Sequence, residues 1–370
     1  MKISYEDLVD FEKLEDVYHI IKCNTKHKEK ILKYEVFYTS NTLNILEILK
    51  SKKYVHGKYN VFLINYPKCR IIMSENMTDK IINHLVSKYV LFRVIEPRLI
   101  PTNVATRKDK GSKTALLYLK KYINKLKLNH DKIYVLKCDI HKYFYSIDHE
   151  ILLEKLDKII EDKDIFNLVK TIIYSTNYDY INEDIEYKIN KQREYVKNLN
   201  ISEHEKELKY QELNKLPRYF KGKGLPIGNM TSQIMAIFYL SELDHYIKEK
   251  LHIKYYIRYM DDLILLHHDK EYLKVCLKEI EKKVESLKLH LNNKTQIYEL
   301  HHGFPFLGYK FILKDKKLYV LLNPNTKKRI VKRLKKYKKD YDKKMEILKN
   351  YNGYLSVASS KAFVRSQSKR

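Results

Sequence analysis

The chain is poor in several residues that mark particular classes of protein. It has no tryptophan, four cysteines, seven prolines and eight glycines in 370 residues. The cysteines stand far apart and none belongs to a Cys-x-x-Cys pair, which argues against a disulfide framework and against a zinc site. No apolar run approaches the ~18 residues of a membrane span, and the first residues lack the apolar stretch of a signal peptide. We therefore expect a cytoplasmic protein with no membrane partner.

Acidic residues are also in short supply. The chain has 46 Asp and Glu against 73 Lys and Arg, which gives a net charge of +27 and a pI near 9.5. Lys, Ile, Asn and Tyr have A/T-rich codons, so compositional drift is one source of the lysine excess. Solubility alone does not call for such a surplus, and a surplus of this size attracts polyanions, nucleic acid first.

The hydrophobic pattern divides the chain into segments of different character. Residues 1–60 have the spacing of short amphipathic helices, and residues 133–140 form a strand-like apolar run that ends near Asp139. Residues 176–221 are dense in charge and poor in periodicity, which we interpret as an insertion between two core elements. Beyond Phe311 we expect a basic helical tail.

That tail has a distinct charge pattern. Residues 324–350 contain twelve Lys or Arg and three acids, while Ile330, Val331, Leu334 and Tyr337 recur at helical spacing. Two interpretations remain open, a solvated helix and a helix that lies along a phosphate backbone.

Two adjacent carboxylates carry most of the chemical information. Asp261 and Asp262 lie between two short apolar runs, an arrangement that predicts a β-hairpin with the acids at its tip. A solvent-exposed turn is the alternative. Asp139, at the end of its own strand, would add a third carboxylate, although it could also cap a helix, a role that Asp148 fits at least as well. Three carboxylates on adjacent strand ends form a site for two hard divalent cations, about 3.5–4 Å apart.

A glycine cluster precedes an apolar helix. Three of the eight glycines fall within residues 222–228, just before the apolar positions of residues 234–240. Glycine permits close approach of the backbone to a ligand, and a helix N-terminus favours phosphate. The ending of a Walker A loop is missing, and a plain loop-to-helix junction is the alternative.

Taken in order, these segments resemble the motifs of reverse transcriptases. KCDIHKYFYSIDH, which contains Asp139, is followed by GLPIGNMTSQ (224–233), YMDD (259–262), NNKT (292–295) and FLGY (306–309). Upstream, YPKCRII (66–72) and ATRKDKGSKTAL (105–116) are similar to the fingers motifs of that family. From about residue 55 to 313, the chain resembles bacterial reverse transcriptases of the group II intron-related lineage.

The resemblance implies an RNA-directed DNA polymerase with an α+β right-hand fold. Residues 1–130 would hold N-terminal helices and fingers. Residues 131–313 would form the palm, a ferredoxin-like antiparallel sheet packed on helices, and residues 314–370 a short basic helical thumb. The implied cofactors are two Mg²⁺, with Mn²⁺ as an alternative, and the substrates are deoxynucleoside triphosphates. The implied partners are a structured template RNA, a DNA or RNA primer and an accessory protein.

The resemblance also assigns roles to individual residues. Asp139, Asp261 and Asp262 would bind the metals, with the Ile140 carbonyl as a further ligand, and Lys294 would protonate the leaving pyrophosphate. The remaining implied roles are nucleotide binding (Lys68, Arg70, Arg107, Ile227 and Gly228), a steric gate against ribose (Phe144) and the primer grip (Phe306, Leu307, Gly308 and Tyr309). The charge density of the tail, independently of the resemblance, favours nucleic-acid binding by Lys327, Lys328, Arg329, Lys332, Arg333, Lys335 and Lys336.

One departure from the common motifs of reverse transcriptases points to a particular group within the family. Many reverse transcriptases carry Gln where this chain has Ile227, and Ser-Pro where it has Ser232-Gln233. The pattern here resembles reverse transcriptases of diversity-generating retroelements, in which an apolar residue accompanies frequent errors opposite template adenine. Defence-associated reverse transcriptases, which use a dedicated RNA or make untemplated or protein-primed DNA, are a close alternative. A nucleic-acid-binding protein without templated activity is the second alternative.

Overall fold

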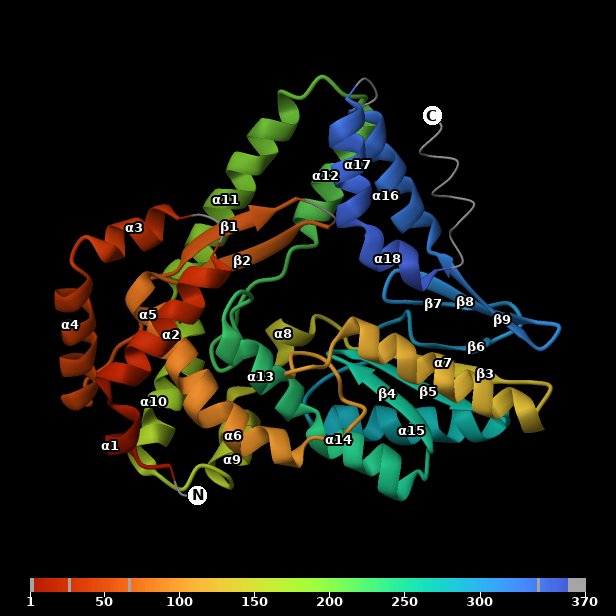
Figure 1. The fold of residues 1–370 in the computed structure, drawn as a ribbon, viewed down its shortest axis with the longest axis horizontal. Coiled ribbons are helices and arrows are strands. Elements are labelled where there is room, and N and C mark those ends of the chain that lie inside the picture. The colour runs from red at the N-terminus through yellow and green to blue at the C-terminus, as the bar shows by residue number, and fades with distance from the viewer. Residues whose placement is uncertain (1–2, 26–27, 66–67, 338–339, 359–370) are drawn as a thin grey trace. The chain divides into compact units, whose positions relative to one another are not determined.

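The computed structural model describes residues 3–25, 28–65, 68–337 and 340–358 (Figure 1). The chain forms two compact units, each built from separate stretches of sequence. The first unit comprises Met1–Pro101, Ile140–Asp244 and Lys283–His290, and the second comprises Thr102–Asp139, His245–Lys282 and Leu291–Arg370. Both units combine helices with antiparallel strands, which agrees with the expected α+β class.

The first unit is mainly helical. Its N-terminal part is formed by α1 (Tyr5–Leu8), α2 (Phe11–Asn24), α3 (Glu29–Glu35), α4 (Tyr38–Lys50), the antiparallel strands β1 (Asn60–Ile64) and β2 (Arg70–Ser74), α5 (Met77–Val86), the π-helical turn η1 (Ser87–Leu91), α6 (Phe92–Ile95) and η2 (Glu96–Arg98). Its second part is formed by α8 (Tyr143–Ser146), α9 (His149–Asp157), α10 (Lys163–Ile173), η3 (Tyr174–Thr176), α11 (Tyr180–Lys197), α12 (Glu203–Asn214), α13 (Met230–Tyr239) and α14 (Ser241–His245).

The charged segment 176–221 is largely helical, which its composition did not indicate. In α11, Ile181, Ile185 and Ile189 recur every four residues and are fully buried. This stripe packs with residues of β1 and β2 in one hydrophobic cluster. Helix α12 begins with a capping box, in which Ser202 and Glu205 exchange hydrogen bonds with each other's backbone N–H. The segment therefore supports the β1–β2 hairpin.

The second unit is built on a four-stranded antiparallel sheet. Its strands are β3 (Tyr134–Asp139), β4 (Tyr255–Tyr259), β5 (Asp262–His267) and β6 (Gln296–Glu299), in the spatial order β4-β5-β3-β6. With helices between β3 and β4 and between β5 and β6, this is the strand order of a ferredoxin-like sheet. Figure 1 shows α7 (Ser112–Asn129) on one face of this sheet and α15 (Lys270–Ser286) on the other.

Both faces of the sheet carry apolar side chains, which explains why helices cover both faces. Val135, Ile264 and Leu266 pack with the buried residues of α7, such as Leu119 and Ile123. The intervening positions Leu136, Leu263 and Leu265 are buried as well. Strand β5 therefore reads as a continuous apolar run, while Lys137 interrupts the run in β3.

The rest of the second unit is a three-stranded sheet followed by helices. The sheet is formed by β7 (Phe304–Phe306), β8 (Tyr309–Lys314) and β9 (Lys317–Leu322), the helices are α16 (Pro324–Lys335), α17 (Tyr341–Asn350) and α18 (Asn352–Val357), and η4 (Tyr246–Lys250) precedes β4. The expectation of a helical tail directly after Phe311 was wrong, because β8 and β9 occupy residues up to 322. Their alternating burial follows a period of two, which the basic composition obscured.

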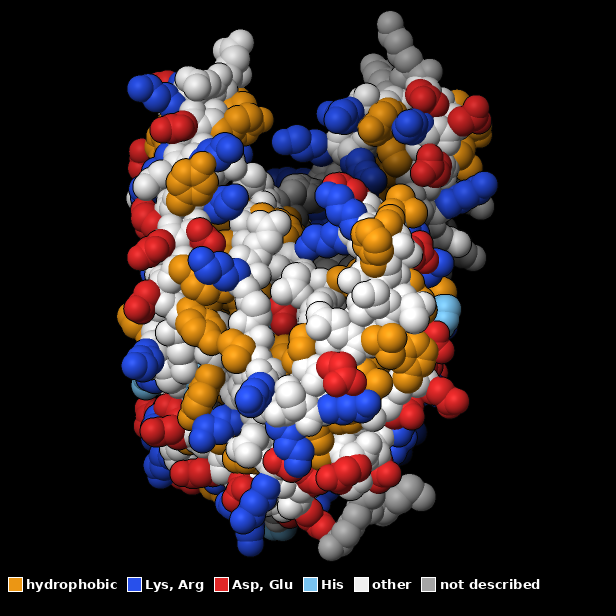
Figure 2. Space-filling view, turned by 90° about the vertical axis from the view of Figure 1, so that its left-hand side faces the viewer, with side chains coloured by type: hydrophobic (Ala, Val, Ile, Leu, Met, Phe, Trp, Pro, Cys, Tyr) orange, Lys and Arg blue, Asp and Glu red, His pale blue; other side chains and the backbone are white. Residues whose placement is uncertain are grey.

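Helix α16 has the two-sided character expected from its sequence. Ile330 and Leu334 are buried against Ile347 and Leu348 of α17, while the lysines of α16 are exposed. Lys338 and Lys339 lie outside the described residues. Figure 2 shows that Lys and Arg side chains on one face of the molecule are interspersed with Asp and Glu.

Candidate active site

Strand register in the second unit brings two of the three expected metal-binding acids together. In the antiparallel pair β3–β5, Asp139 lies directly opposite Asp262. Side chains of directly opposed residues lie on the same face of a sheet, with Cβ atoms about 4.5–5.5 Å apart. Asp261 immediately precedes Asp262, and all three acids are half-buried. The three carboxylates therefore gather at one end of the sheet.

The β4–β5 hairpin places Asp261 in a two-residue turn. Tyr259 pairs with Asp262, so that only Met260 and Asp261 connect the strands. Met260 adopts a left-handed conformation with φ +55°, which is costly for a residue with a side chain. The hairpin predicted from the sequence is confirmed, but its strained tip was not foreseen.

A buried arginine holds this turn. Arg258 is fully buried on β4, and its Nη1 donates a hydrogen bond of 2.9 Å to the backbone carbonyl of Met260. The backbone of Arg258 is bonded on both sides to a neighbouring segment, because its N–H donates to the Thr102 carbonyl and its carbonyl accepts from the N–H of Val104. Sequence reasoning missed Arg258, because a charged residue inside an apolar strand gives no periodic signal.

The carboxylates are suited to cations. Lys137 Nζ lies 3.1 Å from Asp262 Oδ1, with both side chains largely shielded from solvent. The ammonium group of Lys137 thus pairs with this carboxylate, because a partly buried charge is costly without a partner of opposite sign. Among the described residues, no group of three or more His, Cys, Asp or Glu side chains is placed so that it could hold a metal ion. Mg²⁺ is commonly held by one or two carboxylates together with substrate phosphates and water, and the acids here fit that mode.

The turn that carries Lys294 is attached to the strand end at Asp139. The backbone N–H of Asn292 donates to the Asp139 carbonyl at 2.7 Å, and the Asp139 N–H donates to Thr295 Oγ1 at 3.3 Å. Lys294 itself is exposed within this turn. The NNKT motif therefore lies beside the acids within the same unit.

In the first unit, the glycine-containing loop lies between α8 and β2. The N–H of Leu225 donates to the Phe144 carbonyl at 2.7 Å, and the N–H of Met73 donates to the Ile227 carbonyl at 3.0 Å. Gly228 has φ +138°, and a Cβ at this position would lie 2.6 Å from the Met73 carbonyl oxygen. Only glycine fits this close approach. The loop thus places Ile227 and Gly228 next to β2, and its Leu225 is bonded to the backbone of Phe144.

The basic residues expected to bind triphosphate differ in exposure. Lys68 and Arg70 are exposed at the β1–β2 hairpin, while Tyr66 and Pro67 of the same motif lie outside the described residues. Arg107, in the second unit, is buried, and its Nη1 donates to the Asn103 carbonyl at 2.8 Å.

The remaining expected contacts lie in the second unit, apart from the Ile140 carbonyl. Phe306 pairs with Tyr309 across the β7–β8 turn, where Leu307 and Gly308 both have positive φ. Ile140 is buried at the start of a stretch that belongs to the first unit. Helix α16 exposes Lys327, Lys328, Lys332, Arg333, Lys335 and Lys336, and Arg329 is half-buried.

A ferredoxin-like sheet with acids on the end of one strand and on an adjoining hairpin defines a polymerase palm. Residues 57–311 match the family described as reverse transcriptase (RNA-dependent DNA polymerase). Because the match covers well over half of its length, the chain belongs to this family and is an RNA-directed DNA polymerase, a nucleotidyltransferase. Enzymes of this family act on a template nucleic acid and a primer, with deoxynucleoside triphosphates and divalent metal ions.

The match agrees with the extent of the resemblance seen in the sequence. No curated protein matches the chain. Within the described ranges, no helix is both long and apolar enough to cross a membrane.

Proposed function

We propose that Asp139, Asp261 and Asp262 hold two Mg²⁺ ions in this reverse transcriptase. The observation that carries the proposal is the β3–β5 register, which sets Asp139 opposite Asp262, together with the turn that adds Asp261. When bound, the cations would lower the pKa of the attacking 3′-hydroxyl and stabilise the departing pyrophosphate. The Ile140 carbonyl is a further candidate ligand.

Other residues of the chain would bind and orient the substrates. Lys68, Arg70 and Arg107 neutralise the triphosphate, since Arg and Lys form charge-assisted hydrogen bonds with phosphate. Phe144 excludes the ribose 2′-hydroxyl, and Lys294 donates a proton to the pyrophosphate. The 306–309 turn supports the primer strand, and the exposed cations of α16 bind the nucleic-acid backbone.

We further propose that synthesis is error-prone opposite adenine, as in diversity-generating retroelements. The loop backbone at Ile227 is fixed to β2, but its half-buried aliphatic side chain has no group that can hydrogen-bond a nucleotide. A glutamine would restrict the position of the nucleotide, whereas an isoleucine leaves it looser. In this setting the template is a structured RNA, and an accessory protein would assist the enzyme.

Primer extension on a defined RNA template tests these assignments. The reaction contains Mg²⁺ and deoxynucleotides, and the products are sequenced. Asp261→Asn combined with Asp262→Asn should abolish synthesis while RNA binding persists. Asp131→Asn is the matched control, because this carboxylate is largely exposed. Wild-type rates in the double variant would refute the catalytic assignment.

The sequenced products test the proposal that synthesis is error-prone opposite adenine. Errors concentrated at template adenine support the diversity-generating assignment, and Ile227→Gln should reduce them. Faithful copying by the wild type would refute it, as would DNA unrelated to the template.

A further inference from the structure

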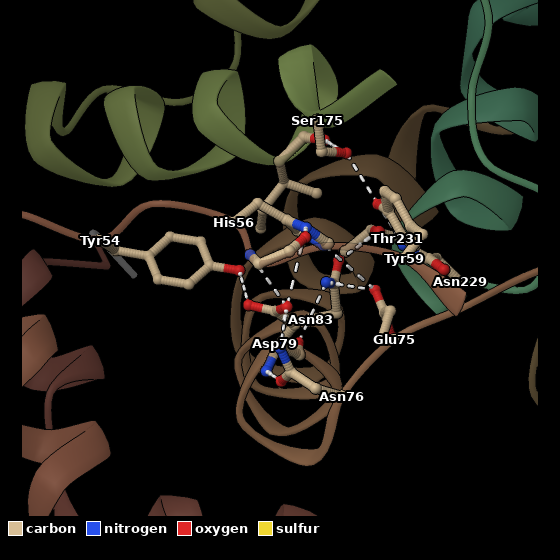
Figure 3. Close-up of polar contacts among 12 residues, drawn as sticks. Tyr54, His56, Tyr59, Glu75, Asn76, Asp79, Asn83, Ser175, Asn229 and Thr231 are labelled. Atoms are coloured by element: carbon tan, nitrogen blue, oxygen red, sulfur yellow. Dashed lines mark hydrogen bonds and ion pairs between the residues drawn. The ribbon is translucent and has the colours of Figure 1, made fainter. Parts of the chain in front are cut away.

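A buried polar network lies in the first unit and reaches Asn229 and Thr231 at the start of α13 (Figure 3). Its centre is His56, whose side chain is almost completely buried between two carboxylates. His56 Nε2 lies 3.7 Å from Glu75 Oε1, and His56 Nδ1 lies 3.7 Å from Asp79 Oδ2. We call these residues and the side chains bonded to them the His56 network.

Burial alone would lower the pKa of His56, but Glu75, Asp79 and the Gly57 carbonyl, which lies 2.7 Å from His56 Nδ1, together raise the pKa above its ordinary value. Burial raises the pKa of Glu75. Other groups near these carboxylates are the Tyr54 hydroxyl, which donates to Asp79 Oδ1 at 2.8 Å, and the partly buried Lys80. Lys30 Nζ donates to the backbone carbonyl of Glu75 at 3.1 Å. Isolated buried charges are costly, so a network of this size needs compensating interactions throughout.

The surrounding backbone is shaped to fit this network. The N–H of Gly57 donates to Asp79 Oδ2 at 3.0 Å. A Cβ on Gly57 would lie 2.5 Å from Asn76 Nδ2 and 2.8 Å from Asp79 Oδ2. Asn76 also caps α5 by accepting a hydrogen bond from the N–H of Asp79. Because Gly57 has no side chain, the side chains of Asn76 and Asp79 can approach its backbone closely.

Two chains of contacts connect the network to the start of α13, one made of hydrogen bonds and one that includes a ring contact. In the first, Asn83 donates to Glu75 and accepts from Thr231 Oγ1 at 2.6 Å. In the second, the ring of Tyr59 packs against His56 with centroids 4.5 Å apart, and Asn229 Nδ2 donates to the Tyr59 hydroxyl at 3.1 Å. Asn229 and Thr231 lie just after Ile227 and Gly228 in the sequence.

We propose that the His56 network positions the loop around Ile227 and Gly228 for nucleotide binding, with Asn229 and Thr231 as its two points of attachment. This inference rests on the proposed function, in which Ile227 and Gly228 contact the incoming nucleotide. Its residues are positioning residues, because they act on the loop and not on the substrate. The loop is thereby fixed on both sides, by β2 at Ile227 and by the network at the start of α13.

The test compares two substitutions at one position. Thr231→Val keeps the shape of the side chain but removes the hydroxyl that donates to Asn83, and Thr231→Ser keeps the hydroxyl. We expect Thr231→Val to raise the KM for deoxynucleotides about three- to tenfold, the effect of one buried hydrogen bond, with kcat changed much less. Thr231→Ser should stay near the wild type. Tyr59→Phe tests the second attachment point and should act in the same direction.

Hydrogen exchange of the peptide spanning residues 225–237 provides a readout that does not need catalysis. Exchange should be faster in Thr231→Val than in Thr231→Ser, while peptides of the second unit remain unchanged. Equal exchange in the two variants would overturn the proposal, and so would a KM that does not distinguish them. A wild-type enzyme that makes no cDNA would refute the proposed function alone, and the exchange comparison would still decide this inference. If Thr231→Val fails to fold, Tyr59→Phe is subjected to both measurements.

Discussion

Replacing Arg258 should show how far this side chain holds the turn that carries Met260 and Asp261. Arg258→Met keeps much of the aliphatic volume but removes the donor to the Met260 carbonyl. A hydrogen bond from a charged group contributes about 1.5–3 kcal/mol, and the left-handed conformation of Met260 costs about 1–2 kcal/mol. Losing the bond lets the turn relax and recover part of that strain. The net destabilisation should be about 1–2 kcal/mol, or roughly 1–3 °C in the unfolding midpoint of a chain of this length.

The effect on activity should be larger than the effect on stability. Relaxation of the turn displaces Asp261 and Asp262, and a misplacement of about 1 Å at a reacting centre can reduce the rate about 100-fold. The assay is single-nucleotide primer extension at saturating substrate, alongside thermal unfolding. Arg93→Met, at an exposed position, is the control. Wild-type turnover in Arg258→Met would refute the argument that this side chain holds the catalytic turn.

Three other perturbations probe the gate, the basic helix and the buried histidine. Phe144→Ala should admit ribonucleotides, and an unchanged preference for deoxynucleotides in competition assays would place the gate elsewhere. RNA affinity should fall steeply with salt, and replacing the exposed lysines of α16 by Gln should reduce that slope; an unchanged slope would identify α16 as a solvated helix. His56 has a raised pKa, so its stabilising contribution is fully present below its unfolded pKa of about 6.5 and is lost as the pH rises through its folded pKa. The stability advantage of the wild type over His56→Gln should therefore shrink as the pH rises above about 6.5, and a constant difference in unfolding midpoint would contradict this.

The strands that carry Asp139 and Asp262 could be predicted because local patterns specify them. The apolar run before Asp139 and the two runs around Asp261 and Asp262 form strands as expected, and Asp148 caps α9 by accepting a hydrogen bond from the N–H of Ile151. The pairing of β3 with β5 follows from contacts distant in sequence, so the opposition of Asp139 and Asp262 required the structure.

Buried polar groups could not be identified from sequence patterns. His56, Glu75 and Asp79 read as ordinary polar positions, and their meeting depends on how β1, β2 and α5 pack. The stripe of isoleucines in α11 was obscured by the charged residues between them, and the alternation in β9 was obscured by the basic segments that flank it. In both α11 and β9, the apolar periodicity was present in the sequence, but the many charged residues around it made it hard to recognise.

The contact between Gly228 and β2 has a consequence for how such an enzyme can diverge. A side chain at position 228 would collide with the Met73 carbonyl oxygen, so its acceptance requires an earlier shift of the strand backbone. That shift would also move the hydrogen bond from Met73 to Ile227. The two segments, far apart in the sequence, are therefore bound to change together and in a fixed order. Any path that replaces Gly228 must therefore pass through a change in the hairpin first.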